Sequence, residues 1–204
     1  MMAAGGGGAF PTEGLVFHAS FRDVIAAETG QTLANDGGCE LAADSDLGRN
    51  FCRIECGVLS WSDLSGFPVG SEPFTLSVLA KIDENSGGTV VFGWGSTPTS
   101  PTVATLALDG EGNICPCSWG PDTIFVHDPG GWHHWCFTHA GGDVNVHCDG
   151  ELIRSDVMTF NIGVGKGAFG TWWTGHRGVF GVANARIYNR ALSSAEVKAL
   201  AKEV

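Results

Sequence analysis

The sequence predicts an all-β protein: a sandwich of two antiparallel sheets followed by one short helix. Three observations support this fold class. The 204 residues include 31 glycines and only three methionines, which is typical of many short strands joined by tight turns. Apolar and polar residues alternate along several segments, as they do on half-buried strands. Turn signals separate these segments at intervals of about 8–12 residues, the spacing expected for a sandwich or a barrel.

Strand-like segments begin near residue 14 and continue through the middle of the chain. Residues 14–21 (GLVFHASF) and 72–83 (EPFTLSVLAKID) are the first two clear examples. In the second segment every other residue is apolar, which places these side chains on one face of a strand. They are Phe74, Leu76, Val78, Ala80 and Ile82. Residues 87–119 continue the pattern, with a turn signal at Asp109-Gly110.

Residues 122–155 are predicted to form successive hairpins with glycine-containing turns. The turns are expected at Gly130-Gly131, Gly141-Gly142 and Asp149-Gly150. A two-residue loop at the second of these places Trp135 opposite Cys148 and Phe137 opposite Val146. These four side chains, together with Val144, are therefore expected on the core face.

The other face of this hairpin is expected to face solvent. It carries four side chains of types that bind metals. They are His134, Cys136, His147 and Asp149. Two interpretations remain open, an outer-face metal or ligand site and an ordinary solvated strand face. The same register points Cys136 and Cys148 to opposite faces, so they should not form a disulfide, and it makes His133 a hydrogen-bonded residue at the boundary of the core.

A helix signal follows the last strand-like segment. Ser193 followed by Glu196 fits a capping box, and Val197 and Leu200 form a short apolar stripe. We therefore expect a helix over residues 193–203. A short helix of this kind can cover an open edge or end of a sandwich.

Charge and the first residues limit the classes of function. The formal net charge is −11 and the basic residues are scattered singly, which argues against nucleic acid as a partner. No apolar run approaches the roughly 20 residues of a membrane span. Residues 1–13 lack a secretory signal and are expected to form a flexible or tethering Gly/Ala-rich arm before a domain over residues 14–204. Synthesis in the cytoplasm with seven free thiols is therefore expected; a virion surface, or an extracellular location after removal of a signal, remains open.

Several segments resemble one family. Residues 130–152 (GGWHHWCFTHAGGDVNVHCDGEL) are similar to a hairpin of laminin-G-like domains in the concanavalin A-like superfamily. Residues 178–200 (GVFGVANARIYNRALSSAEVKAL) resemble the closing strand and helix of these domains, and residues 14–21 and 73–82 resemble their opening strands. The resemblance implies a jelly-roll sandwich of two antiparallel sheets, usually an accessory domain that binds glycans or proteins.

The resemblance also raises the question of calcium. Members of the family often hold calcium through a carboxylate just after the first strand and others near the closing strand. Here Asp23 stands one residue from the usual first place, and Ala183 and Asn184 occupy positions where acidic residues are common. Calcium takes about six to eight oxygen ligands. Asp23 is therefore the candidate calcium ligand, and calcium binding stays open.

Catalysis is not expected from this sequence. The glycanases of the superfamily carry a strand motif, E-x-D-x-x-E, that the sequence lacks, and it also has no G-x-S-x-G nucleophile elbow. A glycan-active hydrolase is therefore a remote alternative.

Tryptophans supply the other candidate site. Trp172, Trp173 and His176 lie in the glycine-flanked segment GAFGTWWTGHRG, and Trp119 is a further candidate. Indole rings in a loop stack on sugar rings or fill a partner's pocket, whereas in a strand at least one of the pair would face the core. We therefore expect a non-catalytic recognition or adhesion domain for a glycan or protein surface. The alternative is a structural accessory protein, a decoration or tail-associated component, of a phage virion or similar assembly, because the chain is acidic and poor in lysine. Its partners would then be assembly neighbours or further copies of the chain in a homo-oligomer.

Overall fold

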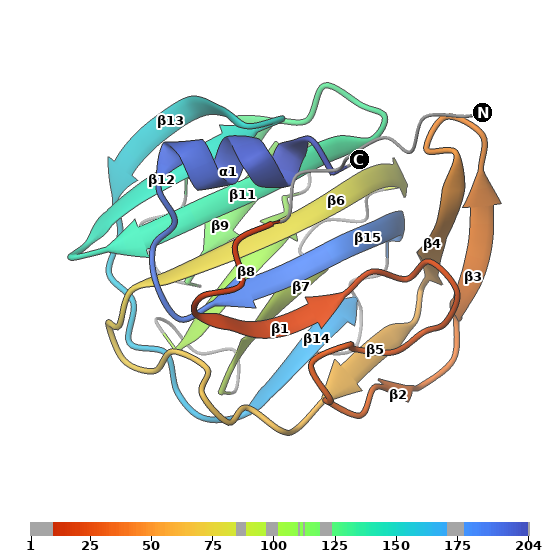
Figure 1. Cartoon of the computed structure of the whole chain (residues 1–204), viewed down its shortest axis with the longest axis horizontal. Coiled ribbons are helices and arrows are strands. Elements are labelled where there is room, and N and C mark those ends of the chain that lie inside the picture. Colours follow the sequence, from red (N-terminus) through yellow and green to blue (C-terminus); the bar gives the residue numbers. More distant parts are fainter. Residues whose placement is uncertain are drawn as a thin grey trace, which may run out of the picture.

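The computed structural model describes residues 10–84, 89–96, 102–109, 111, 113–118, 124–170 and 178–203. Over these residues the chain forms two antiparallel sheets and one short helix (Figure 1). The predicted all-β sandwich with a C-terminal helix is confirmed. The described residues contain no helix that is both long and apolar enough to cross a membrane.

The first sheet, sheet A, has the strand order β13-β12-β11-β6-β15-β4-β3, with β1 also paired to β15. Its strands are β1 (Leu15–Ala19), β3 (Cys39–Asp44), β4 (Arg49–Glu55), β6 (Phe74–Glu84), β11 (His133–Ala140), β12 (Asp143–Cys148), β13 (Glu151–Val157) and β15 (Val179–Tyr188). The second sheet, sheet B, has the order β10-β9-β8-β7-β14-β5-β2. Its strands are β2 (Ala34–Asn35), β5 (Val58–Trp61), β7 (Val90–Gly95), β8 (Val103–Leu108), β9 (Asn113–Cys117), β10 (Val126–His127) and β14 (Lys166–Gly170).

The predicted hairpin between β11 and β12 is confirmed in its register. Trp135 pairs with Cys148, and Phe137 pairs with Val146. The turn at Asp149-Gly150 also joins neighbouring strands, β12 and β13. The prediction of a hairpin at Gly130-Gly131 is wrong, because β10 belongs to sheet B and β11 to sheet A. Two glycines mark a turn, but they do not say whether the next strand stays in the same sheet.

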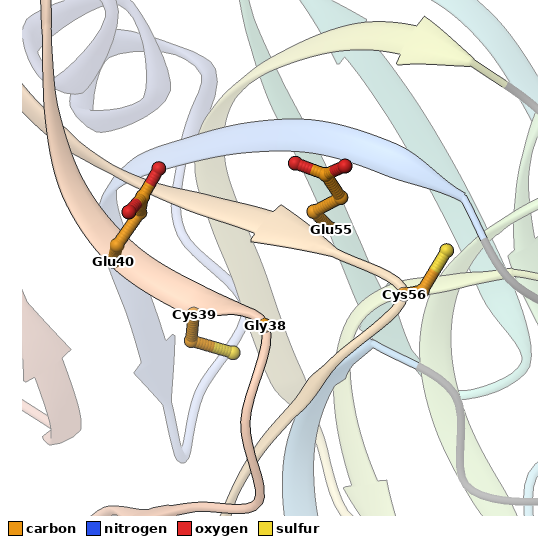
Figure 2. Close-up of a pocket in the computed structure, with 5 residues that line it drawn as sticks. All are labelled: Gly38, Cys39, Glu40, Glu55 and Cys56. Carbon is orange, nitrogen blue, oxygen red and sulfur yellow. The ribbon is translucent and has the colours of Figure 1, made fainter.

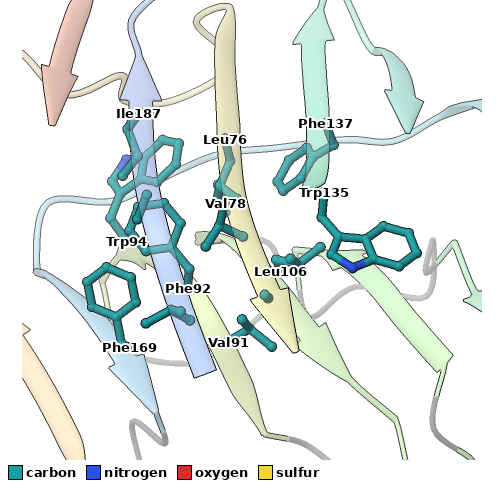
Figure 3. Close-up of a cluster of buried hydrophobic side chains, with 14 of the residues drawn as sticks. Leu76, Val78, Val91, Phe92, Trp94, Leu106, Trp135, Phe137, Phe169 and Ile187 are labelled. Carbon is teal, nitrogen blue, oxygen red and sulfur yellow. The ribbon is translucent and has the colours of Figure 1, made fainter. Parts of the chain in front are cut away.

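Aromatic rings fill the space between the two sheets (Figure 3). Phe92 and Phe169 stack with their ring centroids 4.6 Å apart. Trp94 lies edge-on to Phe74 at 5.1 Å, and its indole Nε1 donates to the carbonyl of Pro68. Trp94 is fully buried.

Helix α1 (Ser194–Ala201) begins with the predicted capping box. The Ser193 hydroxyl accepts from the backbone of Glu196, whose carboxylate in turn accepts from the backbone of Ser193. The helix lies across the outer side of β11 and β12 (Figure 1), where its buried residues Val197 and Leu200 pack with Cys136. It therefore covers a sheet face, and the expectation that it would close an edge or an end is corrected.

The segment before β1 also contacts the outer side of sheet A. Residues 1–9 of the predicted arm lie outside the described residues. Phe10, within the predicted arm, packs beneath the Arg186 guanidinium, with 4.2 Å between the guanidinium carbon and the ring centroid. Its ring also approaches His18, at 5.2 Å between centroids.

Candidate functional site

The four candidates for an aromatic binding site fall in two segments outside the described residues. Trp119 and the segment 171–177, which holds Trp172, Trp173 and His176, lie outside the described residues. Their role in binding therefore stays a prediction.

Asp23 is exposed and lies in the segment that follows β1. The nearby Glu28 carboxylate is engaged, because it accepts from the backbone and hydroxyl of Ser20. Among the described residues, Asp23 joins no group of three His, Cys, Asp or Glu side chains close enough to share a metal ion. Calcium at Asp23 stays a prediction that rests on the resemblance.

The face of β11 and β12 that we expected in solvent is buried. His134, Cys136 and His147 are 2%, 1% and 3% exposed, because α1 and Phe10 cover this side of the sheet. His134 Nε2 lies 2.8 Å from the Ser77 hydroxyl. The expectation of a solvated outer-face patch is therefore wrong for these three residues, although the face assignment itself was correct.

Asp149 leaves this patch and joins a different group. It has a left-handed backbone (φ 50°), so its side chain breaks the alternation of the strand. One carboxylate oxygen accepts from the His134 backbone N–H at 2.9 Å, and the other lies 2.7 Å from His133 Nδ1. One ligand atom each from His133, Cys148 and Asp149 lies within 4.8 Å of the other two. We call these three residues the rim cluster.

Hydrogen bonds satisfy both ring nitrogens of His133. Nδ1 faces the Asp149 carboxylate, and Nε2 lies 3.0 Å from the carbonyl of Gly130. Burial lowers the pKa of His133, but these two acceptors outweigh it and raise the pKa above its usual value. Burial and the carboxylates of Asp149 and Asp128 raise the pKa of the Cys148 thiol to about 12. The prediction of a hydrogen-bonded boundary histidine is confirmed.

A pocket of about 390 Å³ opens where β3 and β4 meet (Figure 2). It is lined by Gly38, Cys39, Glu40, Glu55 and Cys56. The two carboxylates lie on one side of the strand pair, and the Cys39 sulfur lies on the other. Arg53, which pairs with Glu40 across the strands, approaches Glu55 to 3.5 Å and Asp83 to 3.8 Å.

Sequence reasoning missed this pocket for a definite reason. The glutamates are 15 positions apart and come together only through the pairing of Glu40 with Arg53. The glycines that flank the two strands, Gly37 before β3 and Gly57 after β4, would have been the usable signal. A side chain at Gly57 would meet the carbonyl of Gly37 at 2.0 Å, so this close approach of two chain segments requires glycine.

The buried His134 predicts loss of stability in acid. Burial, then the Arg186 charge, lowers its pKa to about 3, below the value of about 6.5 expected in the unfolded chain. The unfolded chain therefore binds more protons below pH 6.5, and the free energy of unfolding should fall there by up to about 1.4 kcal/mol per pH unit. Urea denaturation at pH values from about 7 to about 5 measures this effect. The free energy of unfolding of His134→Gln should change less with pH over this range than that of the wild type.

His133→Gln provides a contrast of opposite sign. The pKa of His133 is higher in the folded protein than in the unfolded chain. Protonated His133 therefore stabilises the folded protein at pH values below its unfolded pKa, and this stabilisation is lost as the pH rises through its folded pKa. His133→Gln should therefore steepen the loss of stability in acid. Equal slopes for wild type and His134→Gln would mean that His134 is protonated in the folded protein.

Comparisons with known proteins agree on the fold. A family profile for the concanavalin A-like lectin/glucanases superfamily matches residues 57–198. No relative among curated proteins matches the chain by sequence. The binding domain of Paraclostridial Mosquitocidal Protein 1 superposes with a TM-score of 0.73 at 14% identity, over 92% of this chain and 52% of that chain. This chain therefore spans about half the length of that toxin domain.

Two further solved structures are similar. Domain 4 of an extracellular arabinanase from Geobacillus stearothermophilus, in complex with arabinotriose, has a TM-score of 0.68 at 20% identity, over 92% of this chain and 98% of that one. Trypanosoma rangeli sialidase has a TM-score of 0.70 at 20% identity, over 97% of this chain and 34% of the enzyme. Binding domains and an enzyme thus share this sandwich. With the family profile covering more than half of its residues, the chain belongs to the concanavalin A-like lectin/glucanase superfamily.

Proposed function

We propose that this chain is a non-catalytic recognition domain that binds a glycan in the pocket between β3 and β4. The pocket carries the proposal: two exposed carboxylates stand on one side of a concavity of about 390 Å³. This volume falls within the roughly 300–1,000 Å³ typical of small-molecule sites. The arabinanase domain, which corresponds to this chain over nearly its whole length, was solved with a bound oligosaccharide, and this supports the same class of ligand.

The chemistry of the pocket favours a neutral sugar. The carboxylates of Glu40 and Glu55 are strong acceptors for sugar hydroxyls, and Arg53 beside Glu55 supplies donors. A net charge of −11 disfavours an acidic glycan. The specificity expected from this arrangement is for a sugar that presents neighbouring hydroxyl groups to two carboxylates.

A glycan-array screen with matched variants tests the proposal. Wild type should bind a neutral glycan selectively, and Glu55→Gln and Glu40→Gln should weaken binding at least about tenfold, because each removes a charged hydrogen-bond acceptor. Glu111→Gln, an exposed residue between β8 and β9 of sheet B, is the control and should bind as wild type. Unchanged binding in both pocket variants would refute the pocket as the site and direct attention to Trp172 and Trp173.

The same screen addresses calcium and the alternative function. It should be run in chelator and again with calcium as the sole divalent cation. Binding that requires calcium would support Asp23 as a ligand, whereas binding that survives chelator would argue against it. No binding in any condition would favour a structural component of an assembly such as a virion, for which the acidic, lysine-poor surface is the supporting feature.

A further inference from the structure

The rim cluster joins two parts of the chain at one end of sheet A. His133 opens β11, and Cys148 and Asp149 form the end of β12 and the turn that follows it. Cys148 and His133 lie toward the core side of the sheet, where Cys148 packs against the main core and the His133 ring lies 6.3 Å from that of Trp135. Asp149 reaches them because its backbone is left-handed. Each ligand atom is thus held by a strand or a tight turn.

We propose that the rim cluster binds one zinc ion through His133, Cys148 and Asp149. Within the described residues this is the one set of three metal-ligating side chains whose ligand atoms lie mutually within 4.8 Å. One histidine nitrogen, one thiolate sulfur and one carboxylate oxygen are ligands that zinc, a borderline-soft cation, accepts. Three protein ligands leave the fourth position of a tetrahedral zinc site open. Calcium, which takes about six to eight oxygens, does not suit it.

Small movements bring the three atoms to zinc distances. Zn–N and Zn–O bonds of about 2.0–2.2 Å place the two ligand atoms roughly 3.3 Å apart in a tetrahedral site. His133 Nδ1 and Asp149 Oδ2 are now 2.7 Å apart, with a proton between them. Zinc would take the place of that proton and of the thiol proton of Cys148, and both protons would pass to solvent.

Neighbouring groups would orient and reinforce these ligands. The Gly130 carbonyl would keep its hydrogen bond to Nε2 of His133, which fixes the ring with Nδ1 free for the metal. The His134 backbone N–H would hold the other oxygen of Asp149. The Asp128 carboxylate already raises the pKa of both His133 and Cys148, and its charge would favour a cation. Zinc would therefore cross-link the start of β11 to the turn after β12.

Titration of the reduced, untagged full chain with zinc chloride, followed by isothermal calorimetry and native mass spectrometry, tests this inference. We expect one zinc per chain and a higher melting temperature with zinc present. Cys148→Ser and His133→Gln should each weaken binding at least about tenfold. Cys56→Ser removes an exposed thiol outside the cluster and should bind zinc as wild type.

Cobalt(II) provides a readout that folding defects cannot imitate. Cobalt in the site should give a thiolate-to-metal charge-transfer band in the near ultraviolet that disappears in Cys148→Ser but persists in Cys56→Ser. Absence of zinc binding by a folded wild type, or equal affinity in wild type and Cys148→Ser, would overturn the inference. Because no glycan is used, neither result depends on whether the chain binds sugars.

Discussion

Replacing Trp94 with alanine should lower the free energy of unfolding by about 4 kcal/mol, within the range measured for large aromatic truncations. The indole is fully buried between the sheets, in edge-on contact with Phe74 and Phe67. Alanine would leave a cavity at this junction and would leave the Pro68 carbonyl without the indole donor. This loss is a large part of the roughly 5–15 kcal/mol that stabilises a typical domain. Urea denaturation monitored by far-ultraviolet circular dichroism provides the measurement.

Two variants separate the contributions of volume and hydrogen bonding. Trp94→Phe keeps most of the ring volume and loses the hydrogen bond, so it should cost roughly half as much as the alanine variant. Val164→Ala truncates a side chain that is 78% exposed and should change stability by less than about 0.5 kcal/mol. A cost below about 1 kcal/mol for Trp94→Ala would contradict the close packing between the sheets.

The parts of the fold that the sequence predicts well are those governed by local geometry. The register of β11 and β12 follows from the Gly141-Gly142 turn and the alternation of Trp135 and Phe137, and it is confirmed pair by pair. The helix start follows from Ser193 and Glu196, whose side chains satisfy backbone groups within one turn. Neither prediction requires knowledge of what lies elsewhere in the chain.

The errors arise where distant segments meet. Alternation placed His134 and His147 on the correct face, but it could not reveal that α1 and Phe10 lie over that face. The pocket glutamates depend on the pairing of β3 with β4, and the rim cluster depends on a left-handed residue at Asp149. Contacts of this kind are set by tertiary packing, which a period of two in one strand does not encode.

The covered face also contains a buried charge. Arg186 is 2% exposed, and its guanidinium donates to the Glu203 carboxylate at 2.5 Å. Asn184 donates to the Glu203 backbone carbonyl at 3.1 Å, so Glu203, the second residue after α1, is held at two points. Burial lowers the pKa of Arg186, whereas the Glu203 charge opposes that change. Within the described part of the chain, Arg186 Nε and Nη1 have no hydrogen-bond acceptor. The buried guanidinium is therefore poorly solvated, and its ion pair is with the Glu203 carboxylate.

Glu203→Ala should therefore lower the free energy of unfolding by about 2–3 kcal/mol, because it leaves the buried Arg186 charge without its counter-ion. Breaking a fully buried pair costs about 3–5 kcal/mol, and partial access of water to Glu203 keeps the loss at or below the lower limit of that range. Arg186→Met should cost less, and Arg186→Met combined with Glu203→Ala should be more stable than Glu203→Ala alone, since the unpaired charge is then absent.

Lys198→Ala is the control. It removes the exposed ion pair between Lys198 of α1 and Glu151, and it should cost less than about 1 kcal/mol. Urea denaturation of the four variants measures these differences. A double variant no more stable than Glu203→Ala would mean that the lost stability comes from the packing of the chain end, not from the buried charge.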